Sequence, residues 1–252
     1  IPGIPKCFSA NTMVMKKDGS VVPFSELKIG DELKYDGKIL TFMKLSAHGE
    51  DLYQYENIIV SGNHRIYINK DMLNCIEVNK DKRFKKIDNN LDYLYCIETE
   101  NNTITIDNIM FTDWNDLDES DNEKINFDKE ATIIHNNYVG GFHKDTLIEL
   151  QDGNIIPISK IDVNSILRYG ERVCGVVKIK ASDLDIYNYN YEFFDFNGRN
   201  IHFIDKNLGV ISTKKIENNK KIKKTKYLYH LITDKQQFYI NGSLVLDYNS
   251  CV

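Results

Sequence analysis

Short runs in which apolar and polar residues alternate, separated by turn residues, make up most of this chain. Segments 12–15 and 21–24 are two such runs, and Asp18-Gly19 between them favours a hairpin turn of type I′, in which φ is positive. Segment 25–31 then predicts a turn or a single helical turn that leads into a further strand. The N-terminal region is therefore predicted to begin with a β-hairpin.

The same alternation continues in the middle of the chain. Segments 93–99 and 103–106 flank Glu100-Asn101-Asn102 and predict a second hairpin. A charged stretch at 116–129 is ambiguous, and long helical periodicity is absent elsewhere. The pattern as a whole predicts an all-β fold.

The pattern occurs twice, with a constant offset of 134 residues, as from Thr12 to Thr146. The offset still holds between Asp113 and Asp247, so insertions within the middle third must cancel. Two copies predict tandem domains, because a solenoid needs several stacked repeats to bury its core. The predicted order is an upstream segment 1–6, a domain 7–119, a linker 120–140 and a domain 141–252. Further matched positions are Asp18-Gly19 with Asp152-Gly153, Pro23 with Pro157, Ser25 with Ser159, Tyr35 with Tyr169, and Leu94-Tyr95 with Leu228-Tyr229.

Composition sets limits on function. The hydrophobic fraction of 42% is enough for packed cores, and a net charge of −5 gives no electrostatic footprint for nucleic acid. Basic clusters at 80–86 and 214–226 are interrupted by Asn, Asp or Glu, which favours solvated loops or hairpin tips over a nucleic-acid surface. No run of about 18 apolar residues is present, and segment 1–5 lacks the pattern of a signal peptide. We therefore expect neither a nucleic-acid nor a membrane partner, and the composition does not identify a compartment.

The five cysteines do not show the spacing of a zinc site or of a disulfide framework. Cys75, Cys96 and Cys174 lie in apolar, strand-like runs, where a buried thiol that serves as a small hydrophobic side chain is expected. Cys7 differs, because it follows the proline-rich and glycine-containing segment 1–5 at a predicted domain boundary. The sequence thus predicts no metal and no cofactor, and it marks Cys7 as the candidate reactive thiol.

Three motifs in the first copy occur in the order that a known family shows. Cys7-Phe8-Ser9-Ala10-Asn11-Thr12 opens the copy, Val60-Ser61-Gly62-Asn63-His64-Arg65-Ile66 follows, and Leu94 to Trp114 ends it. Together these motifs resemble the Hint domain, the module shared by inteins and Hedgehog autoprocessing domains, over most of residues 7–114. The resemblance implies two tandem horseshoe-shaped β domains, of which the first carries the active residues.

The resemblance also implies self-cleavage at the Lys6–Cys7 peptide bond. A cysteine thiol can attack the preceding carbonyl carbon through a five-membered ring and convert the peptide into a thioester, because proximity supplies the effective concentration. By resemblance, His64 accepts the thiol proton and protonates the leaving nitrogen, and Ser61 takes the usual threonine position. The upstream segment is then the substrate, and water, a thiol, an amine or an alcohol is the acceptor. A protein of this kind is a single-turnover autocatalyst.

The end of the first copy lacks the His-Asn pair at which splicing inteins cut. Asp113 stands in the aligned segment 111–114 and, by resemblance to Hedgehog-type sterol transfer, is a candidate base for the incoming nucleophile; an acidic turn residue is the alternative. His135 and Asn136 resemble the His-Asn ending of inteins, but Asn137 carries no nucleophile. Cleavage or transfer at Cys7 is therefore expected rather than splicing. For that segment, cleavage after Asn136 and a simple role as part of a linker both stay open.

The second copy lacks the candidate catalytic residues. Gly141 stands at the Cys7 position, and aligning segment 61–64 with Asn197-Gly198-Arg199-Asn200 puts Asn200 at the His64 position. The copy keeps its turn and core positions, which suggests packing, folding support or ligand binding. The competing hypothesis is therefore a catalytically inert pair of β domains with a structural or interaction role.

Overall fold

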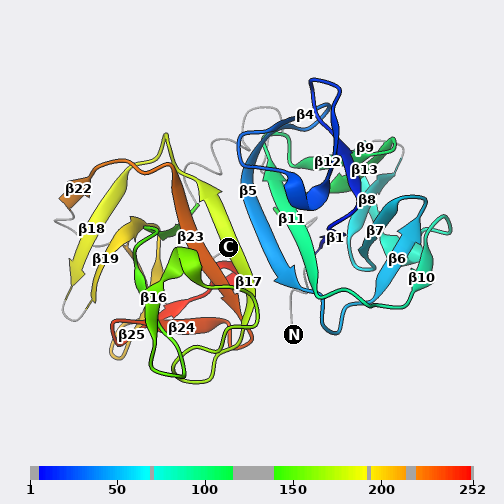
Figure 1. Cartoon of the computed structure of the whole chain (residues 1–252). Helices are drawn as coiled ribbons and strands as arrows, with labels where there is room; N and C mark the ends of the chain where they lie inside the picture. The colour runs from blue at the N-terminus through cyan, green and yellow to red at the C-terminus, as the bar shows by residue number, and fades with distance from the viewer. Residues whose placement is uncertain (1–5, 69–70, 116–138, 192–193, 214–219, 251–252) are drawn as a thin grey trace. The chain divides into compact units, whose positions relative to one another are not determined.

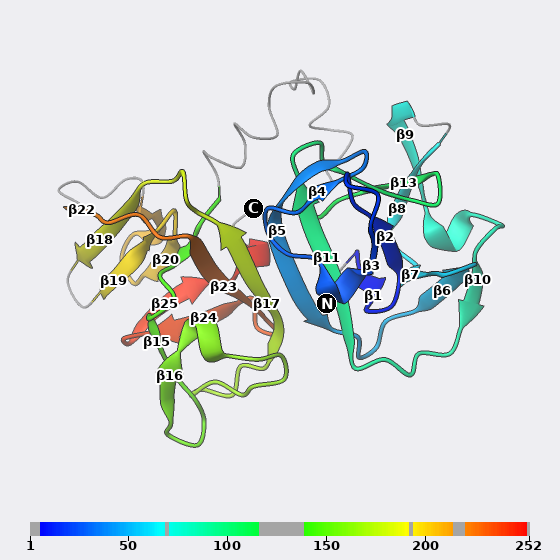
Figure 2. The same ribbon diagram turned by 45° about the horizontal axis from the view of Figure 1, so that its top comes forward.

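The structure of the protein is a computed structural model of the whole chain. It describes residues 6–68, 71–115, 139–191, 194–213 and 220–250. The chain divides into two compact units, residues 1–133 and 134–252. Almost every regular element in both units is a β-strand (Figures 1 and 2), and the helical segments in the described ranges are 3₁₀ turns of three residues. The all-β prediction is therefore confirmed. The ambiguous stretch at 116–129 and most of the predicted linker lie outside the described residues.

The main sheet of the first unit contains six antiparallel strands in the order β10-β6-β7-β1-β11-β5. Its centre is the short strand β1, which lies between β7 and β11. The strands are β1 (Phe8–Ser9), β5 (Gly37–Ser46), β6 (Leu52–Tyr55), β7 (Ile58–Ser61), β10 (Lys85–Ile87) and β11 (Tyr93–Thr99).

A second sheet of this unit has the order β12-β13-β8-β9, and smaller elements complete the unit. The strands of this sheet are β8 (Arg65–Ile68), β9 (Asp71–Glu77), β12 (Thr103–Ile106) and β13 (Ile109–Thr112). The smaller elements are β2 (Met13–Met15), β3 (Val21–Pro23), β4 (Glu32–Leu33), η1 (Phe24–Glu26) and η2 (Val78–Lys80).

The second unit repeats the two sheets of the first strand by strand, whereas β4 has no matching strand among its described residues. Its main sheet has the order β22-β18-β19-β14-β23-β17, its second sheet has the order β24-β25-β20-β21, and β15 pairs with β16. The main strands are β14 (Gly141–Phe142), β17 (Val173–Lys180), β18 (Ile186–Tyr191), β19 (Phe194–Arg199), β22 (Lys220–Ile222) and β23 (Tyr227–Thr233). The others are β15 (Leu147–Glu149), β16 (Ile155–Pro157), β20 (His202–Asp205), β21 (Gly209–Ser212), β24 (Gln237–Ile240), β25 (Ser243–Leu246), η3 (Ile158–Lys160) and η5 (Tyr248–Ser250).

The backbone register agrees with the repeat found in the sequence. Phe8 pairs with Tyr95 in the first unit, as Phe142 pairs with Tyr229 in the second, so both partners obey the 134-residue offset. The offset grows only in the hairpin β18–β19, whose strands have six residues each where β6 and β7 have four. The insertions therefore fall in the middle third, where the sequence required them to cancel.

Two hairpin predictions need correction. The β2–β3 hairpin forms, but only Gly19, with φ of 86°, has positive φ, and its N–H donates to the Lys16 carbonyl. The turn is thus not type I′ but a three-residue loop that ends in a left-handed glycine. The second predicted hairpin does not form, because β11 pairs with β1 and β5, whereas β12 pairs with β13. A turn at 100–102 instead carries the chain from one sheet to the other.

The basic clusters also differ from expectation, since the structure places part of each in a strand. β10 and β22 are the edge strands of the two main sheets, and each carries a lysine paired with an aspartate, Lys86 with Asp51 and Lys221 with Asp185. Charged side chains on an edge strand oppose pairing with another chain. These lysines therefore have a structural explanation that needs no nucleic acid.

Each unit has its own core, built on a phenylalanine from the short central strand. Phe8 lies 5.0 Å from both Phe24 and Phe111, measured between ring centroids, and is completely buried. Phe142 has the same place in the second unit and contacts Phe196 and Phe238. Truncating such a residue costs about 3–5 kcal/mol. These cores hold the central strands, and with them the residue before each phenylalanine, in fixed positions.

Candidate functional site

Cys7 lies in the middle of a row of five residues that crosses the main sheet of the first unit. The pairs Leu52 with Ser61 and Cys96 with Met43 are direct cross-strand partners. Continuing the β1 register by one residue sets Cys7 opposite Ser61 on one side and opposite Cys96 on the other. Directly opposed residues of an antiparallel sheet point to the same face, and all five are completely buried. We call this set the Cys7 row.

The peptide nitrogen of Cys7 is held by the side chain next to it in the row. The Cys7 N–H donates to Ser61 Oγ at 2.9 Å, and the Ser61 N–H donates to the Cys7 carbonyl oxygen at 2.9 Å. In a regular antiparallel pair the Cys7 N–H would donate to the Ser61 carbonyl oxygen, whereas here it donates to the Ser61 hydroxyl oxygen. The structure thus brings Ser61 to the nitrogen of the Lys6–Cys7 peptide, which the sequence alone did not show.

A tight turn connects Ser61 to His64. The His64 N–H donates to the Ser61 carbonyl at 3.1 Å, and the Gly62 N–H donates to the Asp51 carbonyl at 2.8 Å. A Cβ at Gly62 would lie 2.6 Å from the Tyr53 ring, so this position requires glycine. The turn therefore fixes His64 beside Ser61, at the end of the strand that contacts Cys7.

The His64 imidazole is buried and has one ring nitrogen in use. Nε2 lies 2.9 Å from the Thr112 carbonyl oxygen, which can only accept, so Nε2 carries the proton and Nδ1 keeps a lone pair. Nδ1 is buried and has no hydrogen-bond partner among the described residues. Burial lowers the pKa of His64 to about 3, and the charge of Lys6 acts in the same direction, against the Thr112 carbonyl. The imidazole is therefore neutral at physiological pH, with a lone pair that can accept a proton.

The Cys7 thiol is held in its neutral form. Its pKa lies well above the usual value, first because of burial, then because of a hydrogen bond with Cys96, and also because of the negative charge of Glu50. Burial, with the neighbouring Asp51 carboxylate, raises the pKa of Glu50 to about 7. Glu50 can thus take a proton near neutrality, and its negative charge acts on the Cys7 thiol. Nucleophilic attack by Cys7 needs such an acceptor.

Asp113 is held by backbone hydrogen bonds that have a counterpart in the other unit. The Thr99 N–H donates to Asp113 Oδ2 at 2.9 Å, and the Thr233 N–H donates to Asp247 Oδ2 at the same distance. Both aspartates are completely buried. This shared contact ties the end of the first unit to the last residue of β11 and the end of the second unit to the last residue of β23. The expected role of Asp113 as a base stays a prediction, and His135 and Asn136 lie outside the described residues.

The equivalent row of the second unit keeps its ends and changes its centre. Register places Ile186 and Val177 at the ends and Arg199, Gly141 and His230 between them. Ser61, Cys7 and Cys96 thus become arginine, glycine and histidine. Glu50 is matched by Leu184, which is buried and whose N–H donates to Ala181 as that of Glu50 does to Ala47. The second unit therefore lacks the thiols, the hydroxyl and the carboxylate together.

The structure corrects the alignment of the two units at the histidine. Gly198 pairs with Phe142 as Val60 pairs with Phe8, so Arg199 and not Asn197 takes the Ser61 position. The Ile201 carbonyl accepts the Thr213 N–H at 2.9 Å, as the His64 carbonyl accepts the Val78 N–H at 2.7 Å. Ile201, and not Asn200, therefore takes the His64 position. The longer β18–β19 hairpin explains the shift, and the second unit still has no histidine at the position of His64.

The backbone around Gly140 and Gly141 also differs from that around Lys6 and Cys7. A Cβ at Gly140 would lie 2.2 Å from the Asn200 carbonyl oxygen, and one at Gly141 would lie 3.0 Å from Leu228 Cβ. Asn200 also donates from Nδ2 to the Val139 carbonyl at 2.9 Å. The second unit thus closes over its own N-terminal strand, where the first unit accommodates a lysine and a cysteine.

The cysteines show mixed burial. Cys96 is buried, as expected, whereas Cys75 and Cys174 are partly exposed, so the prediction that all three are buried is wrong for two of them. No disulfide forms among the four cysteines within the described ranges. Those ranges also contain no group of three or more His, Cys, Asp or Glu residues suited to a metal ion. No helix there is long and apolar enough to span a membrane.

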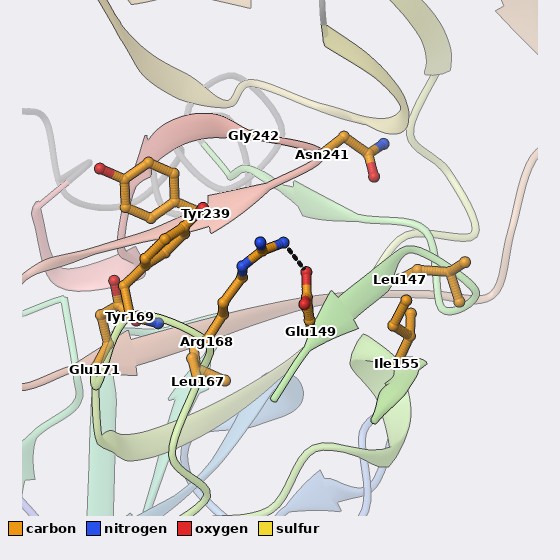
Figure 3. Close-up of a pocket in the computed structure, with 10 residues that line it drawn as sticks. All are labelled: Leu147, Glu149, Ile155, Leu167, Arg168, Tyr169, Glu171, Tyr239, Asn241 and Gly242. Atoms are coloured by element: carbon orange, nitrogen blue, oxygen red, sulfur yellow. Dashed lines mark hydrogen bonds and ion pairs between the residues drawn. The ribbon is translucent and has the colours of Figure 1, made fainter. Parts of the chain in front are cut away.

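The second unit carries a hollow of its own, with a volume of about 240 Å³ (Figure 3). Leu147 and Ile155 form one side, and the rings of Tyr169 and Tyr239, 4.5 Å apart, form another. The ion pair between Arg168 and Glu149, drawn as a dashed line in Figure 3, lies between them. Leu147, Ile155 and Tyr169 are more than half exposed, at 53%, 59% and 51%. Exposed apolar side chains that gather around a hollow favour contact with a partner or a ligand.

No known family model matches the chain, and no curated protein matches it. Function must therefore be argued from the site.

Sequence reasoning missed two residues of this site, Glu50 and Cys96. Neither belongs to a motif, and Cys96 reads as an ordinary buried thiol. The signal that could have found them is a mismatch between the copies. At the 134-residue offset Glu50 corresponds to Leu184 and Cys96 to His230, a loss of charge and a loss of a thiol.

Proposed function

We propose that the first unit is an autoprocessing domain that breaks the Lys6–Cys7 peptide by an N–S acyl shift. The observation that carries the proposal is the hydrogen bond from the Cys7 N–H to Ser61 Oγ at 2.9 Å, next to a buried histidine with a free ring nitrogen. The scissile nitrogen is thus in contact with a hydroxyl that can follow its change from amide to amine. The Hint-like order of the motifs supports the same conclusion.

The first step forms one bond and breaks one. Cys7 Sγ attacks the Lys6 carbonyl carbon, the thiol proton passes to Glu50 or to His64 Nδ1, and the resulting oxyanion collapses with cleavage of the C–N bond. The nitrogen of Cys7 leaves as an amine and takes a proton. Because burial lowers the pKa of His64, its protonated imidazolium is a strong acid and readily donates a proton to the leaving nitrogen. The product is a thioester between Lys6 and the Cys7 side chain.

The second step transfers the upstream segment. A nucleophile attacks the thioester carbonyl, the C–S bond breaks, and Cys7 Sγ regains a proton. Water gives hydrolysis, whereas a thiol, an amine or an alcohol gives transfer. Asp113 is the proposed base for an alcohol acceptor, and it reaches that role only if one of its oxygens leaves the backbone contacts that hold it.

The test is release of a reporter protein fused upstream of residue 1, followed by intact mass. With hydroxylamine or a thiol, we expect a released fragment whose mass ends at Lys6. Cys7→Ala should abolish release, and Cys174→Ala, which removes a partly exposed cysteine of the second unit, should leave it unchanged. A wild-type chain that stays whole under every nucleophile, while its circular dichroism spectrum shows a folded β protein, contradicts the proposal.

A second candidate function is that of an interaction module, and the hollow in Figure 3 is the observation that favours it. Its apolar side accepts an apolar side chain of a partner polypeptide, and Arg168 and Glu149 are placed to bond the partner's backbone. Both functions can coexist, because the hollow belongs to the second unit. Ile155→Glu should then abolish binding of a partner without changing release at Cys7.

A further inference from the structure

Two cysteine thiols face each other at the centre of the Cys7 row. Phe8 pairs with Tyr95 and Ser9 with Leu94, so the next pair along the ladder is Cys7 with Cys96. Both side chains are completely buried, and the neighbouring Cys96 thiol is one of the causes that raise the pKa of Cys7. Cys7 and Cys96 are thus adjacent although 88 residues separate them in the sequence (residues 8–95).

The pair has the geometry in which antiparallel strands can be cross-linked. The N–H and the carbonyl of one strand residue point to the same neighbouring strand, and those of Cys7 are both taken by Ser61 on β7. Towards β11, Cys7 therefore stands in a non-hydrogen-bonded pair, where opposite Cα atoms lie about 4.5 Å apart. Disulfides span Cα separations of about 4.4–6.8 Å. The backbone thus needs no rearrangement to place the two sulfurs at bonding distance.

The pair occurs only at this place in the described chain. The second unit has Gly141 and His230 at the same two positions, and the His230 ring packs against Phe142 and Tyr248 instead. Cys75 and Cys174 form no disulfide with another described cysteine, and they belong to different units. Cys96 is therefore present in the unit that has Cys7 and is replaced in the unit that lacks it.

We propose that Cys7 and Cys96 form a disulfide under oxidising conditions and that this bond locks the autoprocessing site. The oxidant is a small disulfide such as oxidised glutathione. One cysteine attacks it and gives a mixed disulfide, and the second cysteine displaces the remaining half. An S–S bond forms between Cys7 and Cys96, the S–S bond of the oxidant breaks, and two molecules of reduced thiol carry away both thiol protons.

The lock acts on the nucleophile itself and so rests on the proposed function. With Cys7 Sγ bonded to Cys96 there is no thiol to attack the Lys6 carbonyl. Reduction restores both thiols, and cleavage can then begin. Because both thiols are buried, oxidation needs an opening of β1 or takes place during folding, before β1 docks between β7 and β11.

The experiment uses the full chain with the upstream reporter, oxidised with glutathione disulfide in the folded state and, separately, during refolding from urea. In at least one of these conditions we expect a mass lower by two hydrogen atoms and a peptide map that links Cys7 to Cys96. The linked protein should release no reporter with hydroxylamine. A phosphine reductant, which does not cleave thioesters, should restore release to the level of the reduced protein.

Cys96→Ala should remove the link and the loss of release that depends on it, measured against the release of the same variant in its reduced form, and Cys96→Ser serves if the alanine variant does not fold. Cys174→Ala is the matched control and should behave as the wild type. If both oxidation routes yield only glutathione adducts or free thiols, the lock is refuted, whatever the release assay shows. If the link forms and the reduced protein releases nothing, the disulfide stands, and both the proposed cleavage and the locking role fail.

Discussion

The two units have the same scaffold, and they differ where the short central strand meets its neighbours. Phe8 and Phe142 anchor equivalent cores, and Asp113 and Asp247 receive equivalent backbone hydrogen bonds. Around Cys7, by contrast, hydroxyl, thiol and carboxylate groups are replaced by arginine, glycine, histidine and leucine in the second unit. Positions that support the fold are retained, whereas positions that can support acyl transfer change together. This difference supports the proposal that Cys7, Ser61, His64 and Glu50 act together in one reaction.

The strongest test of the comparison removes a buried histidine from each unit. His64→Ala should lower the rate of reporter release about 10²–10⁴-fold, because it removes the group that exchanges protons with the thiol and the leaving nitrogen. His230→Ala should leave the rate unchanged, although His230 is equally buried and also has a nitrogen without a partner among the described residues. Rates from single-turnover mass spectrometry decide the matter. Equal losses of the release rate in the two variants would mean that removing His64 slows release by disturbing the fold and not by removing a proton carrier.

The same two histidines should behave alike in stability. Burial lowers the pKa of His64 to about 3 and that of His230 to about 4, from an ordinary value of 6.5. Between these values and pH 6.5 the unfolded chain binds protons that the folded chain rejects, so stability falls as pH falls. Each histidine contributes at most about 1.4 kcal/mol per pH unit over its window.

Urea midpoints between pH 7 and pH 4 measure this effect. His64→Leu and His230→Leu should each flatten the acid side of the profile. A profile that is as steep in both variants as in the wild type would show that the histidines are already accessible to protons in the folded state.

How far the sequence predicted these features differs from one element to the next. The all-β fold and the β2–β3 hairpin followed from alternation and turn residues, which are local. The β11–β12 hairpin was wrong because segment 93–99 finds its partners in β1 and β5, far away in sequence. A local pattern does not reveal such partners.

The candidate site shows the same division. Cys7, Ser61 and His64 were found through motifs that resemble a family, and the structure brings Ser61 to the Cys7 nitrogen. Cys96 and Glu50 belong to no motif, and only the strand register places Cys96 beside the nucleophile. The alignment error at Asn200 has the same origin, because the longer β18–β19 hairpin is visible in the ladder and not in the residue types.

A third test compares the two aspartates that hold the ends of the units. Asp113→Ala and Asp247→Ala should each destabilise their own unit by about 1–3 kcal/mol, since each leaves a buried backbone N–H without an acceptor. Thermal unfolding of the two variants measures this. If Asp113 also serves as a base, only its variant loses transfer to an alcohol while release by hydroxylamine continues. Identical release and transfer in the two variants would restrict Asp113 to its structural role.

A fourth test concerns the hydroxyl at the scissile nitrogen. Ser61→Ala should slow release about tenfold, because a net hydrogen bond of about 1–1.5 kcal/mol to the Cys7 N–H is lost. Ser61→Thr keeps the hydroxyl and should keep most of the rate. A threonine variant as slow as the alanine variant would show that packing at this completely buried position, rather than the hydrogen bond, sets the rate.

The smallest expected effect concerns Glu50, whose counterpart Leu184 cannot ionise. Because the pKa of Glu50 is raised to about 7 and only its ionised form accepts a proton, release should increase as pH rises through about 7. Glu50→Gln should remove this inflection and lower the rate above it by about tenfold or less, because His64 Nδ1 remains as an acceptor. Asp51→Asn removes a negative neighbour that raises the pKa of Glu50, so it should shift the inflection to lower pH and leave the plateau unchanged. If Glu50→Gln keeps the inflection at the same pH, another group titrates there, and Glu50 is no more part of the reaction than Leu184 is in the second unit.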